Sequence, residues 1–163
     1  MMLTGKKIKY LFVLSAVMIL CDILIGCSGK NEDTKDVPVH KIEERIKQVA
    51  SMEDMEKGDM NRLKKLYHLD ADEVQDFVLY TAESNVEANE LAVIKVKQEN
   101  QAESVKEKIM KRIEAQEVKL KDYRPEQFYL VEKHVLKVKG RYILFTVSKD
   151  AEKIESAFDK AFK

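Results

Sequence analysis

Apolar residues recur at three- and four-residue steps in four stretches of the chain, which is the spacing of amphipathic helices. The first stretch follows Pro38, a residue suited to the first position of a helix, and its apolar stripe consists of Val39, Ile42, Ile46 and Val49. A short second helix is expected over 60–66, with Asp59 as its N-cap. The same spacing predicts helices over 101–120 and 150–162.

Four other stretches are rich in β-branched and aromatic residues and predict strands over 76–82, 90–97, 128–139 and 141–149. Gly140 permits a tight turn between the last two. In chain order the elements read α-α-ββα-ββα. Because the helical stripes need a sheet to cover, the sequence predicts an α+β fold: a single four-stranded antiparallel sheet with helices packed mainly on one face.

The N-terminal pattern differs from the rest of the chain. Three lysines precede an unbroken apolar run over 10–21, which Asp22 then interrupts. A basic start, a short apolar segment and a small residue at the cleavage point are typical of an export signal. The run is shorter than the roughly 20 apolar residues of a membrane-spanning helix. An uncleaved N-terminal anchor remains the alternative interpretation.

Leu24-Ile25-Gly26-Cys27 resembles a bacterial lipobox, with a small residue immediately before the cysteine. The resemblance implies cleavage between Gly26 and Cys27 and attachment of diacylglycerol to the Cys27 sulfur. Cys21 is a weaker candidate because bulky Leu20 precedes it, and a plain buried Cys27 is the other alternative. Two acyl chains give a stable membrane anchor where one chain is marginal.

These signals divide the chain into three parts. Residues 1–26 are the predicted lipoprotein signal peptide, 27–37 the lipidated cysteine and a polar tether, and 38–163 a single α+β domain. Fully extended, the tether reaches about 35 Å. The chain is therefore expected at the cell membrane, lipid-anchored, on its extracytoplasmic face.

The charge balance narrows the choice of partners. The sequence has 29 Lys and Arg against 29 Asp and Glu, and 36% of its residues are charged. Residues 1–26 contain three of the lysines and one aspartate, so the remainder is slightly acidic. Nucleic-acid binding depends on a strong positive field, and no nucleic acid is expected as a partner.

Candidate chemistry is sparse. His40, His68 and His134 lie far apart without acidic or cysteine partners at ligand spacing. No zinc-protease, nucleophile-elbow or phosphate-loop motif occurs. The sequence therefore predicts no catalytic residue, no metal site and no cofactor, and His134 is interpreted as a partly covered strand residue.

Basic residues define one candidate binding surface. If one sheet face is open, basic residues of two predicted hairpins gather there and form a candidate polyanion-binding face: Lys95, Lys97, Lys133, Lys137 and Arg141. Such a face could meet anionic lipid or an anionic wall polymer. The alternative is a solvated face on which lysines keep the sheet soluble.

Several segments resemble a known family. They are the strand starting Asn89-Glu90-Leu91-Ala92, the segment containing Tyr123, Pro125, Glu126 and Gln127, and the turn with Gly140 and Tyr142. In this order they are similar to small lipoproteins of Gram-positive bacteria that are grouped as a domain of unknown function, number 4358. The resemblance spans roughly residues 60–162. It implies an extracytoplasmic, membrane-anchored domain and supplies no activity.

Together these observations predict a membrane-anchored extracytoplasmic lipoprotein that acts as a binding or scaffolding module of the cell envelope. Its expected partners are the membrane, through the lipid anchor, and an envelope protein or anionic wall polymer. A small envelope hydrolase and a substrate-delivery lipoprotein for a transporter are the alternatives.

Overall fold

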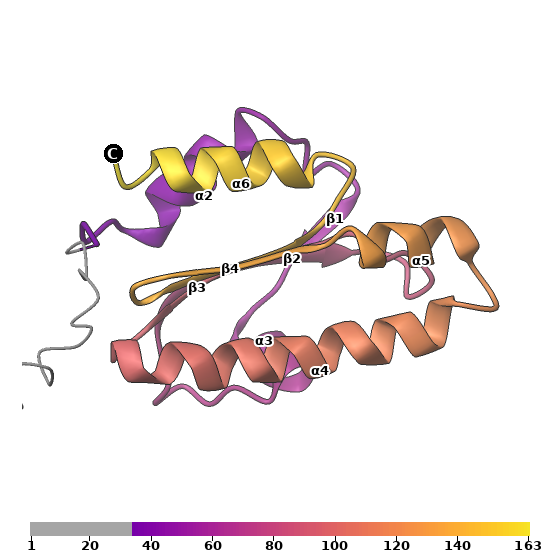
Figure 1. Cartoon of the computed structure of the whole chain (residues 1–163), viewed down its shortest axis with the longest axis horizontal. Helices are drawn as coiled ribbons and strands as arrows, with labels where there is room; N and C mark the ends of the chain where they lie inside the picture. The colour runs from indigo at the N-terminus through magenta and orange to yellow at the C-terminus, as the bar shows by residue number, and fades with distance from the viewer. Residues whose placement is uncertain (1–33) are drawn as a thin grey trace, which may run out of the picture. The chain divides into compact units, whose positions relative to one another are not determined.

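The computed structural model describes residues 34–163. Figure 1 shows these elements in chain order: α2 (Val39–Lys47), β1 (Met55–Lys57), α3 (Met60–Tyr67), β2 (Val74–Ala82), β3 (Glu90–Val96), the 3₁₀ turn η2 (Glu99–Gln101), α4 (Ala102–Leu120), α5 (Pro125–Glu132), β4 (Val135–Lys139), β5 (Tyr142–Val147) and α6 (Ala151–Lys160). No helix in this range combines the length and apolar character needed to cross a bilayer.

The sheet is antiparallel throughout and has five strands in the order β1-β2-β3-β5-β4. The expected number of four strands is wrong because the short strand β1 pairs with the end of β2, from Met55 opposite Ala82 to Lys57 opposite Tyr80. Its sequence, Met-Glu-Lys, contains no β-branched or aromatic residue. Pairing with a longer strand therefore creates β1, and local sequence preference does not.

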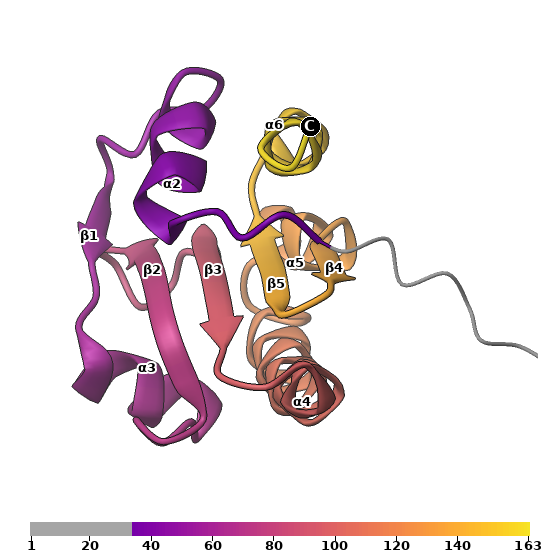
Figure 2. The same cartoon turned by 90° about the vertical axis from the view of Figure 1, so that its left-hand side faces the viewer.

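Helices cover both faces of the sheet, so the expectation that they lie mainly on one face is also wrong. In Figures 1 and 2, α2 and α6 lie on one side of the sheet, and α3 and α4 lie on the other. The reason is visible in β3, where every residue from Glu90 to Val96 is buried. A strand covered on both sides carries an almost continuous apolar run, and Leu91-Ala92-Val93-Ile94 is such a run.

Each face of the sheet has its own hydrophobic core. On the α2–α6 face the buried side chains include Ile42, Ile46, Val93, Leu144, Ile154 and Phe158. On the α3–α4 face they include Leu63, Tyr67, Ile94, Val105, Ile109 and Phe145. The apolar stripes predicted for the helices are therefore the surfaces that cover the two sides of one sheet.

The stretch 128–139, predicted to be one strand, is divided between two elements. Pro125 occupies the first turn of α5, which runs to Glu132, and β4 begins only at Val135. Residues Phe128 to Val131 have strand-like side chains, but packing of Val131 against the α3–α4 core holds them in a helix. His134 consequently lies in the turn between α5 and β4, and its Nδ1 is 2.7 Å from the Val131 carbonyl oxygen.

The segment before α2 is fastened to the middle of the sheet. The Tyr142 hydroxyl lies 2.8 Å from the Val37 amide nitrogen, from which it accepts a hydrogen bond, and 2.8 Å from Asp36 Oδ1. Lys95 also pairs with Asp36. Burial lowers the pKa of Lys95, but the hydrogen bonds to Asp36 and Tyr142 outweigh it and the pKa is raised. The lysine is therefore charged although its side chain is almost fully buried.

A buried carboxylate, that of Glu43, joins α2 to the β1–β2 edge. Glu43 accepts hydrogen bonds from the Tyr80 hydroxyl at 2.6 Å and from Lys57 at 3.1 Å, and it pairs with Lys47 at 2.8 Å. Burial alone would raise the pKa of Glu43. The hydrogen bonds from Lys47, Tyr80 and Lys57 outweigh it and lower the pKa to about 2.

Because of this lowered pKa, the free energy of unfolding of the domain depends on pH in the acid range. The folded-state pKa lies below the ordinary value of 4.5, so the contribution is complete above about pH 4.5 and is lost as the pH falls toward about 2. The lysines are partly exposed and screened, so we expect a loss on the order of 2 kcal/mol. Urea unfolding across this range should show a loss that is larger by about this amount in the native chain than in Glu43→Gln, because Asp36, Asp70 and Glu73 also have lowered pKa values and titrate in both chains. Glu44→Gln, which removes an exposed neighbour, is the control, and an unchanged pH profile in Glu43→Gln would contradict the assignment.

Candidate functional site

A cleft of about 420 Å³ opens between α3, α4 and the loop that joins β2 to β3. Its floor is formed by the end of β2 and the start of β3, where Thr81 lies opposite Glu90. Arg62, Lys65 and Leu66 line it from α3, Arg112, Gln116 and Lys119 from α4, and Asn85, Glu87 and Asn89 from the loop. We refer to it below as the α3–α4 cleft.

Local interactions place these walls. The carboxylate of Asp59 accepts the Arg62 amide at 2.8 Å and starts α3, as the sequence predicted. The helix ends at His68, whose φ of 56° is left-handed. Gln127 Oε1 accepts the Ala88 amide at 2.9 Å, and Lys119 donates to the Asn85 carbonyl at 2.5 Å. The β2–β3 loop is therefore held by both α4 and α5.

Glu90 lies at the centre of a buried polar network on the cleft floor. Its side chain is 1% exposed, and its carboxylate accepts hydrogen bonds from Arg112 Nη2 at 2.9 Å, from Gln116 Nε2 at 3.0 Å and from the Tyr67 hydroxyl. Burial and the negative charge of Glu90 raise the pKa of Tyr67 well above its ordinary value, so the phenol stays a donor. A buried carboxylate with three donors is held rigidly.

Other polar atoms of the same site have no partner. Four side-chain atoms among residues 34–163 are buried without a hydrogen bond, and three of them belong to this site: Thr81 Oγ1, Gln116 Oε1 and Arg112 Nε; the fourth, Thr146 Oγ1, is outside the cleft lining. Thr81 is 5% and Gln116 6% exposed, and both line the cleft. Buried polar groups normally find a partner. This floor therefore has hydrogen-bonding capacity left for a polar guest, whether a water molecule or a ligand group.

The cleft rim has an excess of positive charge. Arg62 is paired with Glu56 at 2.6 Å, and Arg112 with Glu90. Within the described chain Lys65 has no partner, Lys119 has only the Asn85 carbonyl, and Glu87 is the one remaining acidic residue of the lining. Two lysines therefore stand against one exposed carboxylate.

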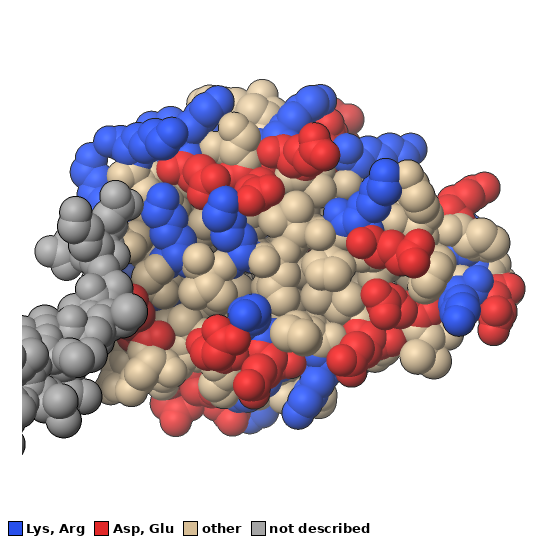
Figure 3. Space-filling model, viewed as in Figure 1, with Lys and Arg blue, Asp and Glu red and all other residues tan. Residues whose placement is uncertain are grey.

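The candidate polyanion-binding residues are distributed differently from the expectation. Lys95 and Lys137 do share the α2–α6 face, but the helices cover it and Lys137 is bonded to Glu155 at 2.8 Å and Asp159 at 2.7 Å. The others also have local partners: Lys97 the Ala71 carbonyl, Lys133 the Tyr129 ring, and Arg141 both Gln75 and Asp36. On the face drawn in Figure 3, basic and acidic side chains alternate. The open sheet face is absent from the described part of the chain, and polyanion binding by these residues stays a prediction.

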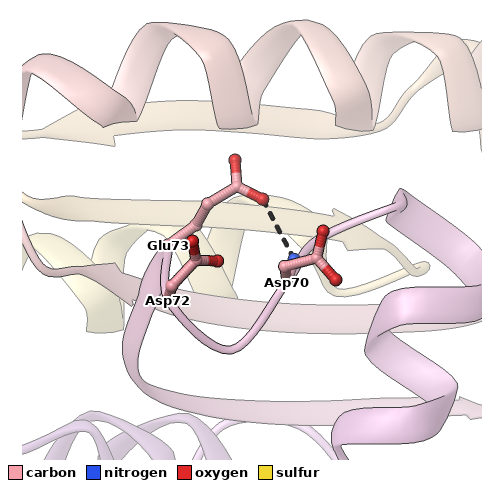
Figure 4. Close-up of side chains that lie close together, drawn as sticks. All are labelled: Asp70, Asp72 and Glu73. Carbon is pink, nitrogen blue, oxygen red and sulfur yellow. Dashed lines mark hydrogen bonds between the residues drawn. The ribbon is translucent and has the colours of Figure 1, made fainter.

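Three carboxylates gather in the turn before β2. Figure 4 shows Asp70, Asp72 and Glu73, whose ligand-type oxygens lie within 4.8 Å of one another. Asp70 is 2.5 Å from Lys64 and Glu73 is 2.6 Å from Lys108, and Glu73 accepts the Asp70 amide at 3.0 Å. These interactions already give the Asp70 and Glu73 carboxylates partners in the turn, and we assign no metal site to it.

A larger groove, of about 530 Å³, lies between α2 and α6. Most of its lining residues are exposed, among them Arg45, Gln48 and Lys153. None of them has a buried polar side-chain atom that lacks a hydrogen bond. None of the three histidines lines the α3–α4 cleft. The cleft is therefore the stronger candidate site.

The sequence analysis missed this site. Its most informative residue, Glu90, stands immediately before the apolar run Leu91–Ile94, and a charge in that position is the one signal that the sequence offered. Gly26 and Cys27, the predicted cleavage and lipidation residues, lie outside the described residues, and both assignments stay predictions.

Comparison with known proteins gives one match. A family model described as a domain of unknown function, DUF4358, matches residues 47–148. No curated protein and no solved structure matches the chain. Asn89, Glu90 and Gln127, which contributed to the resemblance noted in the sequence, all lie at or beside the α3–α4 cleft.

Proposed function

Because the chain belongs to the DUF4358 family, a domain of unknown function, we propose a function from its own residues. The protein is a lipid-anchored binding module on the extracytoplasmic face of the cell membrane, and its ligand site is the α3–α4 cleft. Its partner is a component of the cell envelope.

One observation carries the binding proposal: Gln116 Oε1 and Thr81 Oγ1 are unpartnered and buried on the floor of a cleft with a basic rim. A floor that served only to stabilise the fold would gain by pairing or removing these atoms, because an unsatisfied buried polar group costs about 1–3 kcal/mol. Binding sites commonly combine a concave surface with a few fixed polar groups.

The position of the cleft fits an anchored domain. The N-terminal segment contacts Lys95 near one end of β3, and the cleft lies at Glu90, the other end of the same strand. Five residues of strand separate them by about 17 Å. In Figure 1 the segment enters the domain at the end opposite the β2–β3 loop. The cleft therefore lies at the end of the domain that is farther from residue 34.

Hydrogen exchange of the full chain in lipid nanodiscs tests the binding proposal. Adding a soluble extract of cell-envelope components should slow exchange of the backbone amides in the β2–β3 loop, residues 83–89, because an occupied cleft restrains the loop. The α2–α6 groove provides the internal control, and its amides should not change. Equal effects at both places, or none at the loop, would contradict the proposed site.

A further inference from the structure

We propose that the α3–α4 cleft takes a polyol phosphate, that is, a phosphate esterified to a small chain of hydroxyl-bearing carbons. The inference rests on the proposed function and adds the chemical class of the ligand. Three properties of the cleft lead to it: two lysines against the single exposed carboxylate of Glu87, hydrogen-bonding groups left over on the floor, and a lining without aromatic residues.

Two lysines, Lys65 and Lys119, are the reason for proposing that the ligand carries a phosphate group. Arg62 and Arg112 are neutralised by Glu56 and Glu90, so they add little net charge to the rim. Lys65 and Lys119 approach the cleft from α3 and α4, and neither has a carboxylate partner among residues 34–163. Ammonium groups bind phosphate as point charges, without the planar geometry that arginine imposes.

The unpartnered polar atoms of the cleft floor are the reason for proposing that the ligand carries hydroxyl groups. Gln116 Oε1 can only accept a hydrogen bond, whereas Thr81 Oγ1 can donate and accept. A hydroxyl can donate to the amide oxygen and accept from the threonine at once, whereas the phosphoryl group of a phosphate monoester dianion can only accept. A ligand that fills both roles therefore carries an alcohol beside its anionic group.

The lining argues against an acidic peptide as the occupant. Only Leu66, Ala82, Ala115 and Leu120 are apolar, and no aromatic side chain lines the cleft. The anchors that hold peptide and protein partners are mainly Trp, Tyr and Arg, and both arginines of the lining are already paired with carboxylates. The volume of about 420 Å³ is within the range for small ligands and suits one or two units of a polyol phosphate.

Calorimetric titration of the full chain in uncharged detergent micelles, at low ionic strength, tests the inference with four probes. They are glycerol 3-phosphate, inorganic phosphate, glycerol and a short glutamate-rich peptide. We expect glycerol 3-phosphate to bind more tightly than inorganic phosphate, and glycerol not to bind.

Lys65→Gln with Lys119→Gln should weaken glycerol 3-phosphate binding by about tenfold, as for two lost ion pairs. Lys111→Gln with Lys121→Gln removes two exposed lysines outside the cleft lining and should leave it unchanged.

Thr81→Val separates the two parts of the ligand. It deletes a buried hydroxyl that has no partner, so the fold should tolerate it. The variant should lose the preference for glycerol 3-phosphate over inorganic phosphate and keep its affinity for phosphate.

Equal binding of the two probes by the native chain, or tighter binding of the peptide, would overturn the inference. If none of the probes binds while the envelope extract still protects residues 83–89, the ligand class is wrong and the proposed function stands; if neither acts, both fail.

Discussion

Glu90→Ala should lower the free energy of unfolding by about 3–5 kcal/mol, the usual cost of removing one partner from a buried charge pair. The substitution leaves the Arg112 guanidinium, the Tyr67 hydroxyl and the Gln116 amide without their acceptor on the cleft floor. Domains of this size have total stabilities of only about 5–15 kcal/mol. Urea unfolding followed by circular dichroism would measure the change.

Two further variants control this measurement. Glu114→Ala removes an exposed carboxylate from α4 and should change the stability little. The triple variant Tyr67→Phe, Glu90→Leu, Arg112→Met replaces the network by apolar groups and should recover much of the loss, as buried ion pairs often can be replaced without cost. A loss below about 1 kcal/mol in Glu90→Ala would mean that water reaches the carboxylate.

Cys27→Ser should move the protein almost completely from the membrane fraction to the soluble fraction of cells, or leave it as uncleaved precursor. Two acyl chains hold a protein stably at a bilayer, and a serine hydroxyl cannot form the thioether that attaches them. Fractionation with immunoblotting and the intact mass of the mature chain provide the measurement. Cys21→Ser is the matched control, because Cys21 leaves with the predicted signal. Unchanged fractionation and mass in Cys27→Ser would contradict lipidation at this residue.

Elements with strong local patterns were predictable from the sequence. In α4 the apolar residues spaced by three and four, Ala102, Val105, Ile109 and Ile113, are all buried. The two errors in strand assignment have a common cause: β1 and α5 owe their conformations to the elements that they pack against. A three-residue strand needs the end of β2 beside it, and the strand-like residues of α5 are helical because they pack against α4.

The burial and the partners of charged residues were harder to predict from the sequence. In β3, Lys95 lies on the face opposite Ala92, but nothing near Lys95 in the sequence showed that α2 and α6 cover that face. The α3–α4 cleft depends even more on tertiary structure. It requires the register that sets Thr81 opposite Glu90 and the packing of two helices that begin about forty residues apart in the chain.

The attachment of Asp36 and Val37 to Tyr142 determines how a mechanical load would enter the domain. Tyr142 begins β5, which lies between β3 and β4, and Asp36 is also paired with Lys95 on β3. Tension applied through residue 34 would pass directly to these interior strands, which are held by hydrogen bonds on both sides. The edge strands β1 and β4 would not be the first to separate, so a pulling force on a tethered domain would not unfold it from the edges of the sheet.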